Sequence, residues 1–202
     1  MMKLFHTPAS PFVRKVMVTL IETGQQEDVT LVSVAGSPTA SEQMPLAQNP
    51  LGKIPTLIRE SGPAIYDSRV ICRFFDHRAG GRLYPDSHLW ETLTLEATAD
   101  GIMDAAVLIV YESRCRPEEK RSEDWVESQW DKIARALDAL EGRWMSHLSG
   151  PLDMGQIAVG CALGYLDFRH GARDWRKGRE ALAAWYEGFA GRPAMQATEP
   201  EG

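Results

Sequence analysis

A serine stands near the start of the chain, where an apolar segment gives way to an amphipathic one. Ser10 is followed directly by Pro11, between MKLF and VRKVMVTL. Proline suits the first turn of a helix, where its missing N–H costs nothing, so we expect Ser10 at the helix N-terminus. Its hydroxyl then lies beside unpaired backbone N–H groups and the positive end of the helix dipole. Such a serine either simply caps the helix, which contributes about 1 kcal/mol, or takes part in chemistry there.

A proline in the segment NPLGKIPTL, residues 49–57, is the second candidate. Pro55 opens a short strand-like run, which fits an edge position, and it could also be a cis proline in a turn. In the cis form the backbone of Ile54 is left free to pair with a peptide-like ligand, as an added strand would. An ordinary trans proline at the start of a strand is the alternative.

An acidic residue and a serine come together in YDSRVICRFF, residues 66–75, where a strand is expected to become a helix. Ser68 and the N–H groups that follow it suit an anion, as helix N-termini do. Asp67 adds a negative charge that suits an ammonium group. An α-amino-acid head group carries both charges, although helix capping alone would also explain the pair.

Composition excludes several classes of protein. The chain has 202 residues, of which 44% are hydrophobic, and a net charge of −6, which argues against a non-specific nucleic-acid binder. No apolar run approaches the roughly 20 residues that cross a membrane, and the first residues do not resemble a signal peptide. The three cysteines, Cys72, Cys115 and Cys161, have neither disulfide nor metal spacing. We therefore expect a reduced, cytoplasmic protein without a metal.

The segments around these residues alternate between strand and helix over residues 1–78. MKLF, TLVSV, IPTLI and AIYD are predicted strands, and helices are predicted from about residue 11 to 23 and over SRVICRFFDHR. In the second helix Val70, Ile71, Phe74 and Phe75 are expected on one side. Such alternation indicates helices packed on a small sheet, an α/β layer. Residues 79–88, AGGRLYPDSH, are typical of a linker.

Residues 89–202 contain almost only helix signals. Residues 122–148 place apolar side chains at steps of three and four, which predicts a stripe packed in the core: Trp125, Val126, Trp130, Ile133, Leu137, Leu140 and Trp144. Ser122 is the expected cap of that helix. A second helix should begin near Asp153, with Gln156 completing a capping box, and a last one should cover 179–191.

Taken together, these motifs resemble the glutathione transferase superfamily over essentially the whole chain. SPFVRKV follows the first strand, NPLGKIPTL lies in mid-domain, and YDSRVICRFFD precedes the linker and an all-helical half. The sequence is most similar to bacterial glutathione transferases with a serine at the active-site position. The resemblance implies a thioredoxin-like, glutathione-binding domain over 1–78, a linker over 79–88, and an all-helical domain over 89–202.

The resemblance also implies roles for individual residues. Ser10 takes the catalytic position, and the residues implied in glutathione binding are Lys53, Ile54, Pro55, Asp67 and Ser68. Ile54 would contact the cysteinyl backbone, and Asp67 with Ser68 would bind the γ-glutamyl end. Arg14 is either an electrostatic helper or, more simply, a solvated helix charge. The second-substrate pocket is expected to be lined by Phe12, Met103, Val107 and Tyr111, for which core packing is the alternative.

The serine in this position has a physical task. A thiol has a pKa of about 8.5, so little thiolate is present near neutral pH. Lowering that pKa by two units requires about 2.7 kcal/mol. One hydrogen bond from the Ser10 hydroxyl to the anion could supply about 1.5–3 kcal/mol, and the helix N-terminus about 0.3–1 kcal/mol more. Ser10 is therefore expected to donate to the sulfur of glutathione and not to act as a nucleophile.

The sequence thus favours a cytoplasmic glutathione transferase, a homodimer as is usual in that family, which detoxifies small apolar electrophiles and needs no cofactor beyond glutathione. Neither a nucleic acid nor a membrane is an expected partner. Two other functions stay open: a glutathione-dependent reductase or lyase, and a non-catalytic interaction protein on the same fold. The motif S-P-F-V lacks both cysteines of C-P-x-C, which argues against a disulfide mechanism. Failure to bind glutathione would favour the interaction protein.

Overall fold

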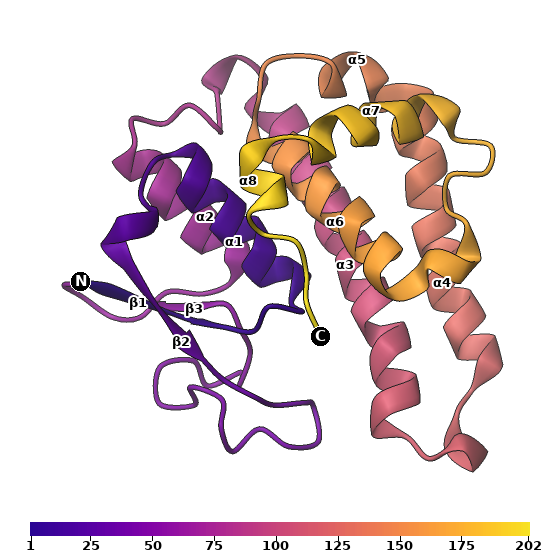
Figure 1. Ribbon diagram of the computed structural model, residues 1–202, viewed down its shortest axis with the longest axis horizontal. Helices are drawn as coiled ribbons and strands as arrows, with labels where there is room; N and C mark the ends of the chain where they lie inside the picture. The colour runs from indigo at the N-terminus through magenta and orange to yellow at the C-terminus, as the bar shows by residue number, and fades with distance from the viewer.

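The computed structural model describes residues 1–202 and contains two regions of different architecture (Figure 1). A three-stranded sheet with two helices forms the N-terminal region, and helices alone form the rest. None of the helices is long and apolar enough to cross a membrane. The expected fold class, a small α/β domain followed by an all-α domain, is confirmed.

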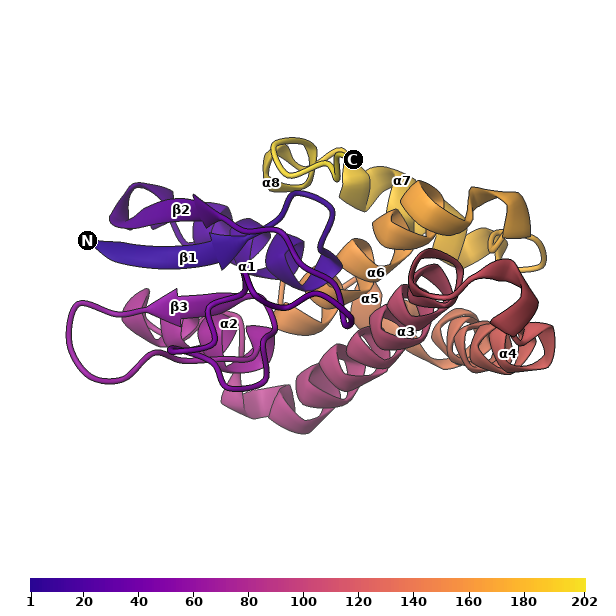
Figure 2. The ribbon, with the colours of Figure 1, turned by 90° about the horizontal axis from the view of Figure 1, so that it is seen from below.

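The N-terminal region is built around the central strand β1 (Met2–His6), in which Met2 and Leu4 are buried. Its sheet has the order β2-β1-β3, with β2 (Val29–Ser33) parallel to β1 and β3 (Thr56–Ile58) antiparallel to it. The helices α1 (Pro11–Glu22) and α2 (Ser68–Arg78) lie against each other on one face of this sheet (Figures 1 and 2). Leu4 and Leu57, which are neighbours in the register, are both wholly buried.

The fourth predicted strand, AIYD, does not form. Ile65 makes a single antiparallel bridge to Leu57, with N–O distances of 3.0 and 2.9 Å. The reason is local, because Gly62 and Pro63 turn the chain just before the bridge and Asp67 already caps α2 just after it. Too few residues are left between these two features for a ladder.

The helical region is organised around two long helices that pack along each other, α3 (Leu89–Cys115) and α6 (Met154–His170). The remaining elements cover these two: α4 (Glu123–Ala139), the π-helical turn Leu140–Trp144, α5 (Met145–Leu148), α7 (Glu180–Ala190) and α8 (Pro193–Gln196). The predicted caps are confirmed. Ser122 accepts from Trp125 N–H, and Asp153 forms a capping box with Gln156.

Two predicted apolar stripes are only partly buried. In α4 the stripe is buried at Ile133 and Leu137, but Trp125 is 36% exposed because α3 and α4 extend past the other helices at this end (Figure 1). In α2, Ile71 and Phe75 are buried as expected, whereas Val70 is 49% exposed. Helical spacing predicts which residues share a side, but not how far a neighbouring element covers that side.

Arg14 joins the two regions, which contradicts the expectation of a solvated helix charge. Its side chain is buried, and its Nη2 donates to the Met195 carbonyl at 3.0 Å. Gly164 of α6 makes room for it, since a Cβ at that position would overlap the guanidinium. Arg14 therefore holds α1 against α6 and the segment around α8.

Candidate functional site

The topology brings the three predicted motifs to one end of the sheet. Since β3 is antiparallel to β1, Pro55 at the start of β3 lies at the same end as the residues that follow β1. The bridge between Ile65 and Leu57 is also antiparallel, so the chain beyond Ile65 returns to that end as well. The starts of α1, β3 and α2, which carry Ser10, Pro55 and Asp67, therefore share one edge of the molecule.

Ser10 is the N-cap of α1 and is half-buried. Its Oγ accepts a hydrogen bond from Val13 N–H at 3.3 Å. This bond uses a lone pair of the oxygen, so the hydroxyl proton is still available to a second partner. Capping and donation to an anion are thus compatible in this serine.

The turn before β3 presents a free backbone group. The Ile54–Pro55 bond is cis, one of the two forms that the sequence allows. Asn49 fixes this turn by donating from Nδ2 to the Lys53 carbonyl at 3.0 Å and to Thr56 Oγ1 at 3.1 Å. The N–H and C=O of Ile54 make no hydrogen bond within the chain, so both can pair with a peptide. The Lys53 side chain is exposed beside them.

The start of α2 offers a second open group. Ser68 is buried, yet its backbone N–H and hydroxyl have no partner within the chain, although a little of this surface is open to solvent. Asp67 caps the helix by accepting from Arg69 N–H at 3.0 Å and also pairs with the Arg69 guanidinium at 2.8 Å. Partial burial would raise the pKa of the Asp67 carboxyl, but the hydrogen bonds and charge of Arg69 outweigh it and the pKa is lowered. Asp67 therefore keeps its negative charge at neutral pH.

A buried chain of charges lies behind Asp67. Arg69 Nε is 3.7 Å from Asp100 Oδ2, and Asp100 Oδ1 accepts from Lys15 Nζ at 2.7 Å. Lys15 is wholly buried and also donates to Glu96 at 3.0 Å. Burial works to lower the pKa of Lys15, but the charges of Glu96 and Asp100 reverse this and raise it. Three carboxylates thus face two cations, and the excess negative charge suits an ammonium ligand.

Sequence reasoning missed this chain of charges, although a signal was present. Lys15 stands on the apolar side of α1, where an unpaired charge would be costly, so a buried partner had to exist. Glu96 and Asp100 are one helical turn apart among the apolar residues of α3. The partners lie 81 and 85 residues from Lys15, and no local pattern connects them.

The expected second-substrate residues divide into two groups. Met103 is wholly buried, which favours the alternative of core packing for this residue. Met103 belongs to the core between α3 and α6. Phe12, Val107 and Tyr111 are half-buried and stay predictions.

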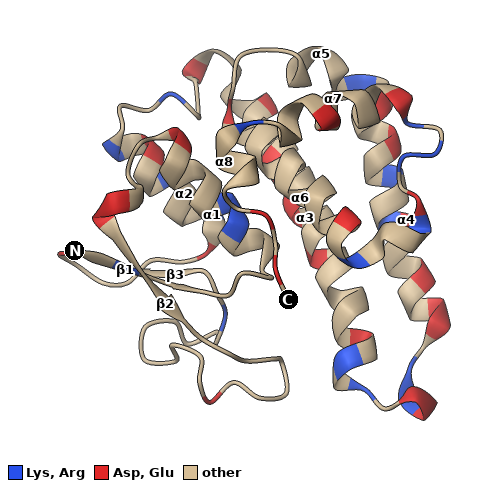
Figure 3. Cartoon of the chain, in the orientation of Figure 1, with Lys and Arg blue, Asp and Glu red and all other residues tan.

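A large groove in the structure belongs to neither predicted site. It has a volume of about 980 Å³ and lies between the outer ends of α3 and α4 and the end of α6. Its lining is mostly charged or polar, including Glu112, Arg121 and Glu127, and acidic and basic residues alternate along this end of the molecule (Figure 3). An apolar substrate would find little to contact there.

Comparisons with known proteins agree with the fold. Models of the glutathione S-transferase N-terminal and C-terminal domains match residues 4–83 and 123–188. The chain is 36% identical to YibF of Escherichia coli (strain K12), an uncharacterized GST-like protein, over 98% of each chain. A glutathione transferase family member from Pseudomonas fluorescens Pf-5, solved with bound glutathione, is 49% identical with a TM-score of 0.97 and full coverage of both chains. A second structure from that organism holds S-(propanoic acid)-glutathione and is 48% identical, with a TM-score of 0.92 and full coverage of both chains.

Proposed function

Because the chain belongs to the glutathione S-transferase family, we propose that it activates the thiol of glutathione with Ser10 for attack on a small electrophile. The observation that carries this proposal is the set of unpaired groups at the starts of α1, β3 and α2. Their shared position at one edge of the sheet matches a tripeptide in polarity. The Pseudomonas relative, whose structure holds glutathione, covers the same residues at 49% identity.

Glutathione would bind through backbone and charge. In this proposal Ile54 pairs with the cysteinyl backbone as a short added strand, which needs both of its free backbone groups. Asp67 takes the γ-glutamyl ammonium, and the unpaired N–H and hydroxyl of Ser68 take the carboxylate. The exposed Lys53 lies close to Ile54 in the chain and would face a further carboxylate.

The chemical step then needs little from the protein beyond charge stabilisation. The thiol proton leaves to solvent, and the Ser10 hydroxyl donates to the thiolate that forms, while α1 contributes its positive end. The sulfur lone pair forms a carbon–sulfur bond, and either a leaving group departs or the adduct takes up a proton. Ser10 keeps its own proton throughout, because no histidine within hydrogen-bond reach could accept it.

A calorimetric titration with glutathione tests the proposal. We expect the chain to bind glutathione and Asp67→Asn to bind it about tenfold or more weakly, since a charge-assisted hydrogen bond is lost. Asp28→Asn is the matched control, because Asp28 also pairs with an arginine, Arg78. It directly precedes β2, at the opposite end of the sheet from the site. Absence of glutathione binding in the unmodified chain would exclude the enzyme and favour the non-catalytic interaction protein.

The second substrate would enter beside Ala9. Ala9 and Arg169 both lie next to Gly202. A Cβ atom placed on Gly202 would be 3.7 Å from Ala9 Cβ and 3.7 Å from Arg169 Nη2. Arg169 donates to the Gly202 carbonyl at 3.1 Å and lies over the ring of Phe168. We propose that the electrophile carries a carboxylate that Arg169 binds in place of this carbonyl. The bound propanoic acid conjugate in the Pseudomonas structure supports an acidic electrophile.

Three finer features of the expected function also stay proposals. A second chain would cover the exposed apolar residues Trp90, Leu51 and Val70 in a homodimer. The free cysteines Cys72, Cys115 and Cys161 are consistent with a reduced, cytoplasmic protein that takes part in detoxification. A glutathione-dependent lyase or reductase would use the same thiolate, and a screen for released glutathione separates it from a transferase.

A further inference from the structure

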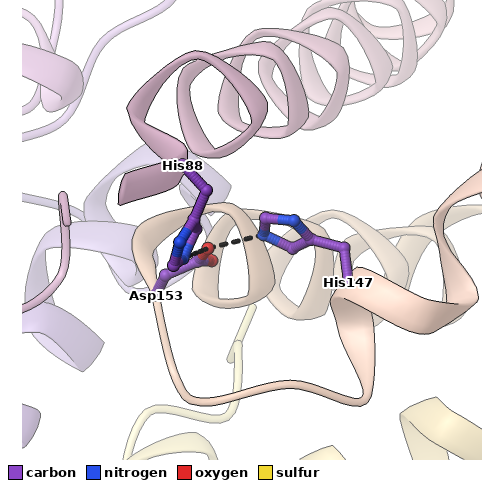
Figure 4. A group of neighbouring side chains, drawn as sticks. All are labelled: His88, His147 and Asp153. Carbon is purple, nitrogen blue, oxygen red and sulfur yellow. Dashed lines mark hydrogen bonds and ion pairs between the residues drawn. The ribbon is translucent and has the colours of Figure 1, made fainter. Parts of the chain in front are cut away.

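Two histidines and an aspartate form a cluster in the helical region that the glutathione site does not use. His88 directly precedes α3, His147 lies in α5, and Asp153 caps α6 (Figure 4). One ligand atom from each side chain lies within 4.8 Å of the other two. Figure 1 shows α3 and α6 beginning at the upper end of the helical region, whereas α1 begins at the lower end, so the cluster is separate from Ser10.

The Asp153 carboxylate is the buried centre of this cluster, at 1% exposure. Its Oδ1 accepts from Gln156 N–H in the capping box, and its Oδ2 accepts from Thr92 Oγ1 at 2.8 Å. His147 Nε2 is 2.6 Å from Oδ2, and the ring points at the carboxylate (Figure 4). The carboxylate is thus oriented by groups outside the cluster, as carboxylate ligands of metals usually are.

His88 is the member of the cluster that makes no hydrogen bond to Asp153, although its ring meets that of His147 edge-on. Its Nε2 is 3.7 Å from Asp153 Oδ2, which is too long for a hydrogen bond. Its Nδ1 is 2.9 Å from Ser87 Oγ. When Nδ1 carries the ring proton and donates it to Ser87, Nε2 presents a lone pair toward the carboxylate. Two acceptors that face each other at this distance are stabilised by a cation between them.

We propose that His88 Nε2, His147 Nε2 and Asp153 Oδ2 bind a divalent transition-metal ion of the Zn²⁺ type. Two imidazoles and a carboxylate are ligands that Zn²⁺ prefers, and a water molecule would complete a tetrahedral site. Metal–ligand distances of about 2.0–2.2 Å place neighbouring ligand atoms roughly 3.3 Å apart. The separation of 3.7 Å at His88 is close to this value, while the shorter one at His147 must open by less than about 1 Å. His88 is 36% exposed, which leaves a path for the ion.

The alternative is that His147 and Asp153 form a structural hydrogen bond and nothing more. That pair and the capping box are complete without His88. His88→Gln therefore separates the two interpretations, because it removes one metal ligand and leaves the cap of α6 in place. His77→Gln is the matched control, since His77 is an exposed histidine on α2 outside the cluster.

The test is a Zn²⁺ titration of the metal-stripped full chain against a chromophoric chelator, repeated with Co²⁺ and followed by its visible spectrum. We expect one ion per chain, unchanged affinity in His77→Gln, and at least about tenfold weaker binding in His88→Gln, because loss of an outer-shell partner alone has that effect at metal sites. Zn²⁺ should also raise the unfolding temperature of the unmodified chain, and raise it less in His88→Gln.

Two results would overturn the metal site: no stoichiometric binding in the unmodified chain, or the same affinity in His88→Gln. Without metal, His88→Gln should unfold at the same temperature as the unmodified chain, which shows that a loss of binding is not a loss of fold. Glutathione affinity should be equal in all three proteins, since the two sites share no residue. The metal site can therefore fail while the proposed function stands.

Discussion

The hydroxyl of Ser10 can serve α1 and a bound thiolate at the same time. Its oxygen already accepts from Val13 N–H, and the hydroxyl makes no other hydrogen bond within the chain. Many helices begin with a serine, so the capping bond alone carries no functional information. What distinguishes Ser10 is its position at the edge where Ile54 and Ser68 also leave polar groups unpaired.

Replacing Ser10 with alanine should change the acidity of bound glutathione more than its affinity. Loss of a hydrogen bond worth about 1.5–3 kcal/mol should raise the thiol pKa in the complex by about one to two units. Glutathione affinity near neutral pH should stay within a few-fold, because neutral pH lies only slightly above the lowered pKa of the bound thiol and ionisation adds little to binding there. The measurement is the ultraviolet absorbance of the thiolate as a function of pH, with glutathione saturating.

Ser10→Thr is the control for this variant, because threonine keeps the hydroxyl and also caps helices. It should retain most of the low thiol pKa. If Ser10→Ala leaves the pH profile of the complex unchanged, the hydroxyl does not stabilise the thiolate, and its only role is the cap.

Between elements, Lys15 of α1 is the strongest electrostatic link to α3. Its ammonium group is wholly buried and faces two carboxylates, Glu96 and Asp100. Replacing Lys15 with methionine preserves the volume but leaves both carboxylates without their cation. We expect a loss of roughly 3–5 kcal/mol in the free energy of unfolding, measured by chemical denaturation.

The loss in Lys15→Met should depend on pH in a defined direction. Burial raises the pKa of the Glu96 carboxyl, and Lys15 opposes that rise in the unmodified chain. Without Lys15 the pKa of the Glu96 carboxyl in the folded chain rises further above its value in the unfolded chain. The ionised carboxyl then destabilises the fold at high pH, and stability recovers as the carboxyl takes up a proton. The loss of stability in Lys15→Met should therefore become smaller as the pH is lowered from about 8 to about 5.

Adding Glu96→Gln and Asp100→Asn to Lys15→Met should restore much of the stability. If stability does not recover, the loss comes from packing and not from charge.

Elements with strong local signals were predicted closely, and those set by distant contacts were not. The helix over SRVICRFFDHR has the predicted bounds, because Asp67 caps it and its apolar residues repeat with helical spacing. The capping box at Asp153 and Gln156 was equally visible. AIYD, in contrast, has strand-like residues but only one partner, Leu57, and the π-helical turn at Leu140–Trp144 has no sequence signal that we recognise.

The same division holds for the candidate site across the whole molecule. Ser10, Pro55 and Asp67 could be named as candidates from the sequence because each stands at a junction of elements that the local sequence marks. Lys15 and its carboxylates were missed because their contacts join the N-terminal region to the helical one over more than 80 residues. The His88 cluster was missed for the same reason, since it joins residues just before α3, within α5 and at the N-cap of α6.

Both regions of the chain also meet where the second substrate is proposed to enter, between Ala9 and Arg169. Arg169→Gln should raise the KM for an unsaturated carboxylic acid about tenfold or more, since a charge-assisted hydrogen bond is lost. The KM for the uncharged amide of that acid should not change. Arg173→Gln is the control, because Arg173 pairs with exposed Glu127 at the outer end of the helical region. Equal effects on acid and amide would mean that Arg169 only shapes the pocket.

An exposed tryptophan at the start of the helical region predicts that two copies of the chain associate. Trp90 is 75% exposed near the start of α3, and a tryptophan of this size left in water is unusual in a monomer. We expect a homodimer in sedimentation equilibrium, and Trp90→Arg should shift it toward monomer, because burial of a large aromatic side chain is worth about 2–5 kcal/mol in such an interface. Trp125→Arg, on the outer part of α4, is the control and should leave the assembly unchanged.

If the unmodified chain is a monomer in sedimentation equilibrium, Trp90 does not lie in a dimer interface. Glutathione titrations of dimer and monomer would then show whether the site at Ser10 is complete within one copy.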